Sequence, residues 1–178
     1  MRIFICVDFP EEITKEIARI QGALSNYKFT GKLTESENLH LTLKFLGEID
    51  EEKLKKVKEA LSTIKFKEFE AKLDLVGIFK IKGNPKIVWI KIGGKDIFNL
   101  QKEIDNSLKD LFKKEERFMS HLTIARIKYT KDKKEFENFI KNIHSRKLYF
   151  KISKFYLKKS DLKPLGPIYT TLEEYKAI

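Results

Sequence analysis

The chain has 178 residues, a length typical of one domain that can bury a hydrophobic core. Its residues are 42% hydrophobic, which excludes a disordered chain. No apolar run approaches the roughly 20 residues that a membrane-spanning helix needs. The net charge of +11 favours a polyanionic partner such as RNA, although a surface rich in lysine and glutamate is also typical of heat-adapted proteins.

The apolar run that begins at Arg2 predicts a buried strand and not a signal peptide, because Asp8 and Pro10 follow it at once and no small-residue cleavage site comes after. We therefore expect a cytoplasmic protein with no membrane partner. Cys6 is the only cysteine, which excludes an internal disulfide and a cysteine-rich metal site. We interpret Cys6 as a small buried hydrophobic residue.

Segments of strand and helix periodicity alternate along the chain. After the strand at 2–8, Pro10 and the acidic residues that follow it indicate the start of a helix, and Asp50 is a candidate N-cap of a second one. The predicted elements are strands at 2–8, 38–46, 69–80, 86–92, 121–127, 148–158 and 168–173, and helices from 10 to about 24 and at 50–64, 96–112 and 132–143. Residues 82–85 form a turn-rich link between two of the strands.

This order of elements predicts an α+β fold of mostly antiparallel strands, with helices on the outer faces of the sheets. Clean βαβ repeats with a glycine-rich turn are absent, which argues against a doubly wound nucleotide-binding fold. No linker rich in Pro, Gly or Ser divides the chain. We therefore expect a single domain over residues 1–178, made of two lobes.

A short motif occurs twice: His-Leu-Thr and an aliphatic residue begin at His40 and again, 81 positions later, at His121. The chain has only three histidines, and the spacing is close to half its length, so the sequence predicts two similar halves. Residues two apart on a strand share a face, so His40 points the same way as Thr42, and His121 the same way as Thr123. The alternate residues are expected to face the core: Leu39, Leu41, Leu43, Leu122 and Ile124.

If an approximate twofold axis relates the halves, the two His-Thr pairs face each other across a central cleft. Imidazole titrates near pH 6.5, so one ring can act as general base while the other acts as general acid. The threonine hydroxyls can donate hydrogen bonds to phosphate oxygens. Arg126 would add positive charge, but strict alternation puts it on the opposite face from His121, so it reaches the site only if the strand twists or bulges.

Other interpretations of the histidines remain open. Both could be core residues bonded to the backbone, although the paired threonines would then be unexplained. A zinc site needs a clustered carboxylate or cysteine, and the sequence has no such cluster and no His-Glu-x-x-His. The third histidine, His144, lacks the threonine and is expected to lie at a helix end without a catalytic role.

The sequence resembles the two-histidine (2H) phosphoesterase superfamily, and within it the LigT-like RNA 2′,3′-cyclic phosphodiesterases, also called 2′-5′ RNA ligases. The resemblance spans the chain and is carried by Met1–Pro10, Glu37–Gly47, His121–Arg126, Ser160–Leu162 and Gly166–Tyr169. One departure is Ser120, where the family usually has proline. The resemblance implies a bilobal α+β fold of two antiparallel sheets, with pseudo-twofold symmetry around a central cleft.

The resemblance also implies hydrolysis of a 2′,3′-cyclic phosphate to a 2′-phosphate, with His40 as proton donor and His121 as proton acceptor. Thr42, Thr123 and Arg126 would hold the phosphate. The implied partner is RNA with a cyclic phosphate end, including tRNA halves. No cofactor or metal is expected, and we expect a monomer. Family members also run the reverse step, an ATP-independent 2′-5′ ligation.

Three alternatives to simple RNA hydrolysis stay open: ligation as the main role, an RNA-binding module in which catalysis is incidental, and a different small cyclic phosphate as substrate. The +11 charge favours RNA over a small substrate. Phe9, at the end of the first strand, is a candidate for stacking on a base, with a core position as the alternative.

Overall fold

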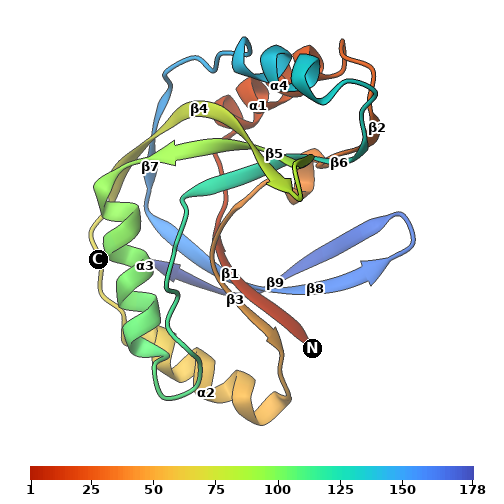
Figure 1. Cartoon of the computed structure of the whole chain (residues 1–178). Helices are drawn as coiled ribbons and strands as arrows, with labels where there is room; N and C mark the ends of the chain where they lie inside the picture. The colour runs from red at the N-terminus through yellow and green to blue at the C-terminus, as the bar shows by residue number, and fades with distance from the viewer.

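The computed structural model describes residues 1–178 as two antiparallel sheets with four α-helices (Figure 1). The strands are β1 (Arg2–Val7), β2 (Thr30–Leu33), β3 (Leu41–Glu48), β4 (Phe69–Ile81), β5 (Asn84–Gly93), β6 (His121–Tyr129), β7 (Tyr149–Ile152), β8 (Lys154–Lys163) and β9 (Gly166–Lys176). The helices are α1 (Glu11–Leu24), α2 (Glu51–Ser62), α3 (Lys95–Ser107) and α4 (Lys133–Lys141), with a 3₁₀ turn at Ser36–Asn38. The predicted α+β class is confirmed.

The two sheets have the strand orders β3-β1-β8-β9 and β2-β6-β5-β4-β7, and every paired strand runs antiparallel to its neighbour. Figure 1 shows the five-stranded sheet above the four-stranded one, with α1 and α4 along the top and α2 and α3 at the lower left. The helices thus lie toward the outside, as predicted. None of them combines the length and the apolar character that crossing a membrane requires.

The helices form where apolar residues recur every three or four positions. In α1 the buried stripe consists of Ile13, Ile17, Ile20 and Leu24. The carboxylate of Asp50 accepts a hydrogen bond from the backbone N–H of Lys53 at 2.8 Å, so the predicted N-cap of α2 is present.

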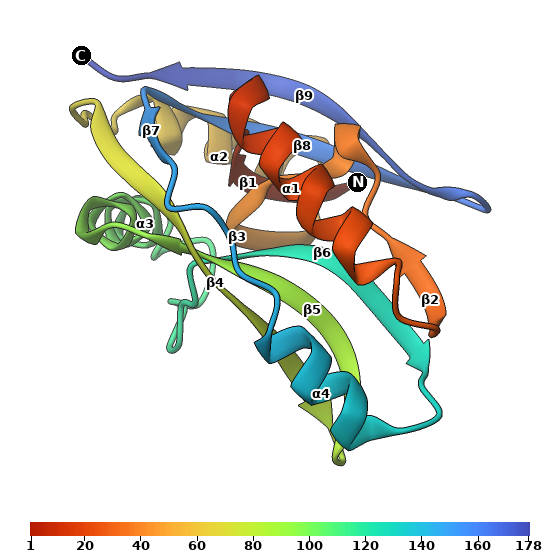
Figure 2. The same cartoon turned by 90° about the horizontal axis from the view of Figure 1, so that it is seen from above.

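Two helices cross from the sheet of the strand that precedes them to the other sheet. Helix α1 follows β1, yet its Gln21 bonds to the backbone of Ile124 in β6. Helix α3 follows β5, yet its Asp105 pairs with Lys44 of β3. Figure 2 shows α1 lying across the molecule from β1 toward β6. One core of 34 buried residues therefore draws on both sheets.

The chain changes sheets at Ser153, inside the run predicted as one strand at 148–158. Strand β7 pairs with β4 in the five-stranded sheet, and β8 pairs with β1 in the four-stranded sheet. Buried residues alternate on each side of the crossing, at Phe150 and Ile152 and then at Phe155 and Leu157, and the alternation shifts by one position between them. The pattern predicts extended chain, but it does not specify the change of partner.

Other boundaries differ for local reasons. Strand β2 was not predicted, because three of its four residues are exposed and it has no apolar alternation. The strand predicted at 38–46 starts at Leu41, after the 3₁₀ turn, and the helix predicted at 96–112 ends at Ser107. Lys82 and Gly83, with φ angles of 49° and 75°, form a two-residue hairpin turn, so β5 starts earlier than predicted.

Candidate active site

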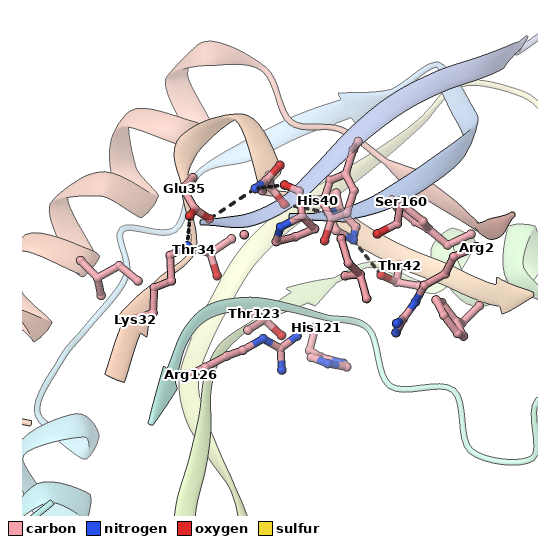
Figure 3. Close-up of a pocket in the computed structure, with 18 residues that line it drawn as sticks. Arg2, Lys32, Thr34, Glu35, His40, Thr42, His121, Thr123, Arg126 and Ser160 are labelled. Atoms are coloured by element: carbon pink, nitrogen blue, oxygen red, sulfur yellow. Dashed lines mark hydrogen bonds and ion pairs between the residues drawn. The ribbon is translucent and has the colours of Figure 1, made fainter. Parts of the chain in front are cut away.

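A cavity of about 430 Å³ lies between the two sheets, and both His-Leu-Thr motifs line it. Figure 3 shows His40 and Thr42 on one side, and His121, Thr123 and Arg126 on β6 at the other. The lining residues are Arg2, Phe4, Lys32, Leu33, Thr34, Glu35, Asn38, His40, Thr42, Phe45, His121, Thr123, Arg126, Ser160, Leu162, Gly166, Pro167 and Tyr169. The fold thus brings together groups that are 81 positions apart in the sequence.

The two imidazoles are held by the same backbone bond. Nδ1 of His40 lies 2.7 Å from the carbonyl oxygen of Asn38, and Nδ1 of His121 lies 2.8 Å from that of Met119. A carbonyl oxygen only accepts, so Nδ1 donates in both rings. Nε2 is therefore the nitrogen that remains for proton transfer, and in His40 it lies 3.0 Å from Oγ1 of Thr42.

Aromatic rings support each imidazole. The ring centroids nearest to His40 are those of Phe4 at 4.9 Å and Tyr169 at 5.2 Å. Those nearest to His121 are Phe79 at 5.0 Å and Trp89 at 6.4 Å. In each case the rings come from the strands that flank the motif strand or from other strands of the same sheet. This packing limits how far either ring can rotate.

The pKa of His40 is lowered below its ordinary value of 6.5. Burial is the largest cause, because it disfavours the charged imidazolium. The hydrogen bond to Asn38 acts in the opposite direction, the positive charge of Lys158 lowers the pKa further, and the carboxylate of Asp8 raises it. Lys158 and Asp8 are themselves an ion pair at 2.6 Å. In the free protein His40 is therefore biased toward the neutral form.

Arg126 lines the cavity because β6 contains a one-residue bulge. Ile124 has no partner on β5, since Thr123 and Ala125 on either side of it pair with consecutive β5 residues. Ile124 and Ala125 are both buried, which shifts the alternation by one position. Arg126 then shares a face with Thr123. Given the alternation of the sequence, a twist or bulge of this kind is required for Arg126 to reach the site.

Strand β3 has the same bulge at the equivalent position. Leu43 has no partner on β1, and Leu43 and Lys44 are both buried. Phe45, the fifth residue after the histidine, is thereby turned to the cavity at the place that Arg126 occupies in the other half. The guanidinium carbon of Arg2 lies 4.9 Å from the centroid of the Phe45 ring. The residue five positions after the motif histidine is thus a cationic arginine in one half and an aromatic phenylalanine in the other.

The structure places Phe9 outside the cavity, which corrects the suggestion that it stacks on a base. Its ring lies 5.6 Å from that of Phe150 and packs against the core. By alternation Phe9 falls on the same side as the buried Ile3 and Ile5 and opposite to Phe4, so the core alternative is the one observed.

The remaining residues that the sequence singled out do not line the cavity. His144 lies beyond the end of α4, and its carbonyl accepts a hydrogen bond from Arg19 at 2.9 Å. Cys6 is buried, and burial raises the pKa of its thiol. Ser120 is buried with an unpartnered hydroxyl, while its carbonyl accepts from Ile92 at 3.0 Å. No three or more His, Cys, Asp or Glu side chains gather at a place that could hold a metal ion.

Sequence reasoning missed several residues of the cavity wall: Arg2, Phe4, Lys32, Phe45, Ser160 and Tyr169. A signal existed for Phe45, which occupies the same position after its histidine as Arg126 does. Arg2 and Phe4 are two positions apart on β1 and therefore share a face of that strand. Nothing in the sequence shows that this face lines the same cavity as the His-Leu-Thr motifs.

The family model described as "LigT like Phosphoesterase" matches residues 7–89 and 92–169. RNA 2′,3′-cyclic phosphodiesterase from Methanocaldococcus jannaschii is 39% identical over 180 residues, covering 98% of this chain and 100% of that protein. The protein of the same name from Thermotoga maritima is 36% identical over 178 residues, covering 98% and 94%.

Solved structures share the fold. The protein TT0787 of Thermus thermophilus aligns with a TM-score of 0.84 and 27% identity, over 99% of this chain and 97% of that one. E. coli LigT complexed with 3′-AMP aligns with a TM-score of 0.77 and 22% identity, also over 99% and 97%. The chain therefore belongs to the LigT-like family of 2H phosphoesterases.

Proposed function

We propose that this chain is an RNA 2′,3′-cyclic phosphodiesterase that opens a terminal 2′,3′-cyclic phosphate to a 2′-phosphate. The observation that carries the proposal is the pair of His-Thr units that face each other across one cavity, with Arg126 beside them. Relatives that are 39% and 36% identical over nearly the whole chain bear this name.

In the proposed reaction, a water oxygen attacks the phosphorus and Nε2 of His121 accepts the water proton. Nε2 of His40 donates a proton to the 3′ oxygen as the bond between that oxygen and phosphorus breaks. The products are a 2′-phosphomonoester and a 3′-hydroxyl. Proton exchange with solvent then returns His40 to the charged form and His121 to the neutral form.

The general acid must be charged when it acts, yet burial lowers the pKa of His40 in the free protein. A bound phosphodiester places a negative charge beside the ring and raises the pKa again. Substrate binding and protonation of His40 are therefore coupled in this proposal. Before substrate binds, the neutral ring avoids the free-energy cost of burying a charged imidazolium.

The other cavity groups supply charge and shape. The hydroxyls of Thr42 and Thr123 donate to non-bridging phosphate oxygens, and the guanidinium of Arg126 offsets the charge that develops on them. Phe45, with Arg2 over its ring at 4.9 Å, provides a flat surface on which a nucleobase can stack.

The same groups can act in reverse, because acid and base exchange roles when a reaction runs backwards. A 5′-hydroxyl of a second RNA, such as the other half of a cut tRNA, would then attack the cyclic phosphate and form a 2′-5′ bond without ATP. We keep hydrolysis as the main proposal, since water competes for the same position at high concentration.

The test of the two-histidine mechanism uses an oligonucleotide with a 2′,3′-cyclic phosphate end, in buffer with EDTA. We expect His40→Ala and His121→Ala each to lower kcat by about 100- to 10,000-fold. His144→Ala is the matched control and should keep wild-type activity, because His144 lies outside the cavity. Full activity in either cavity variant would contradict the mechanism, and a 3′-phosphate product would contradict the assigned leaving group.

The RNA assignment is tested by comparing three substrates: the oligonucleotide, a mononucleoside 2′,3′-cyclic phosphate and ADP-ribose 1″,2″-cyclic phosphate. For the oligonucleotide, a plot of log(kcat/KM) against the logarithm of salt concentration should have a negative slope of about 0.7 per contacted phosphate. The reason is that binding of a basic protein releases the counterions bound to the RNA. The small substrates should depend on salt much less. A higher kcat/KM for the ADP-ribose compound would favour that alternative instead.

A further inference from the structure

A buried glutamine on α1 reaches the bulge that turns Arg126 into the cavity. Gln21 is 9% exposed, and its side-chain NH₂ donates to the carbonyl of Ile124 at 3.0 Å and to that of Thr34 at 2.8 Å. Ile124 is the bulge residue of β6, and Thr34 directly follows β2 and lines the cavity. One amide group thus bonds to two backbone segments of the cavity wall.

These two segments are also joined to each other, so the glutamine completes a closed set of bonds. The backbone N–H of Thr34 donates to the same carbonyl of Ile124 at 2.9 Å. Nearby, β2 lies directly on the backbone of Arg126: a Cβ atom added to Gly31 would come within 2.2 Å of the Arg126 carbonyl oxygen. The position of the Arg126 backbone is therefore tied to β2 and, through β2 and the bulge, to Gln21.

The chemistry of Gln21 differs from that of the rest of its helix face. The other buried residues of α1 are aliphatic except for Glu16, whose carboxylate is bonded to Arg19 and to the backbone of Arg146. Gln21 alone among them donates to strand backbone in the opposite half of the molecule. A buried amide is costly unless it is hydrogen-bonded, so its place in this helix indicates that its bonds to the bulge are required.

We propose that Gln21 is a positioning residue for Arg126: it holds the β6 bulge in the register that presents the guanidinium to the phosphate. The proposal rests on the proposed function only in assigning phosphate contact to Arg126. Without the amide, the bulge carbonyl keeps one bond to Thr34 and β6 is free to shift, which displaces the guanidinium. Displacements of about 1 Å at a charged contact lower rates by up to about 100-fold.

The experiment is a double-mutant cycle between Gln21→Leu and Arg126→Ala, measured as kcat/KM on the cyclic-ended oligonucleotide. In the wild-type background we expect Gln21→Leu to lower kcat/KM about 10-fold, with KM raised. In the Arg126→Ala background it should lower kcat/KM less than about 2-fold, because no guanidinium remains to be misplaced.

A matched control separates positioning from general loss of stability. Gln101 is also a buried helix glutamine, 3% exposed, and its NH₂ donates to Asp105 at 3.0 Å on the opposite side of the molecule. Gln101→Leu also removes a buried side-chain amide. It should change kcat/KM by the same factor in the wild-type background and in the Arg126→Ala background. If Gln21→Leu does not fold, Gln21→Met, which is unbranched and of similar length but has no donor, takes its place in the cycle.

The cycle is repeated with inorganic phosphate affinity, measured by calorimetry, which does not depend on turnover. If the wild type hydrolyses none of the cyclic substrates, the proposed function fails, while coupling in phosphate affinity still supports the role of Gln21. The role is overturned if Gln21→Leu weakens phosphate binding by the same factor in both backgrounds, or leaves it at the wild-type value.

Discussion

The two histidines have the same backbone bond at Nδ1 but different surroundings at Nε2. In His40, Nε2 lies 3.0 Å from the hydroxyl of Thr42, and burial lowers the pKa of the ring. His121 stands across the cavity, on the strand that also carries Arg126. Two residues of the same type in the same motif therefore meet different surroundings.

We expect an anion in the cavity to raise the pKa of His40. Sulfate is a suitable probe because its own charge is constant across the range in which histidine titrates. The pKa is lower in the free protein than in the complex, so binding takes up a proton, and sulfate affinity should rise as pH falls between the two pKa values, by up to about tenfold per pH unit. NMR titration of the three histidine rings, with and without sulfate, measures both effects.

His40→Asn should remove the part of this pH dependence that comes from His40, while leaving a sulfate site formed by Arg126, His121 and the threonines. The resonance of His144, outside the cavity, reports any general effect of the added salt. If sulfate binds but the titration of His40 does not move, the proposed coupling between substrate binding and protonation is wrong.

At the scale of strands, the sequence predicts which side chains share a face where regular alternation holds. It does not predict where a bulge shifts that alternation or which strands pair. His40 and Thr42 share a face because alternation holds between them, and that pair was predictable. Arg126 and Phe45 line the cavity because one extra residue in each strand shifts the alternation, and no local signal marks Ile124 or Leu43 as that residue. The crossing at Ser153 was missed likewise, because an apolar run does not specify its partner strand.

The bulge in β3 also explains a buried charge. It turns Lys44, 5% exposed, toward α3, where its ammonium pairs with Asp105 and donates to the carbonyl of Lys113 at 2.8 Å. Burial by itself would raise the pKa of Asp105, but hydrogen bonds from Lys44, the backbone of Glu115 and Gln101 outweigh it and lower the pKa. This network ties the first motif strand to the segment that leads into the second.

We expect Lys44→Met alone and Asp105→Leu alone each to lower the free energy of unfolding by about 3–5 kcal/mol, because each leaves one unpaired charge in the core. The double variant Lys44→Met/Asp105→Leu should lose clearly less than the sum of the two, since it removes both charges. Urea unfolding at neutral pH measures the wild type and all three variants. Strict additivity would show that the pair is not coupled, contrary to the geometry.

At the scale of the whole molecule, two lobes share one core. Helix α1 contacts the five-stranded sheet and α3 contacts a strand of the four-stranded sheet, and the core cluster includes residues of both sheets. Separating the lobes would expose the inner faces of both helices. We therefore propose that residues 1–178 unfold as a single cooperative domain, with the cavity walls held rigid relative to each other.

The chain offers one natural reporter in each sheet. Trp89, the only tryptophan, lies on β5 of the five-stranded sheet, and Cys6, the only cysteine, is fully buried on β1 of the four-stranded sheet. Across a urea series, the fluorescence of Trp89 and the fraction of Cys6 labelled by a short pulse of thiol reagent should give coincident unfolding curves, because neither sheet keeps its core when the other is lost. Labelling of Cys6 at lower urea than the change in Trp89 fluorescence would show that the four-stranded sheet opens alone, and the two lobes would then be separate domains that meet at the active site.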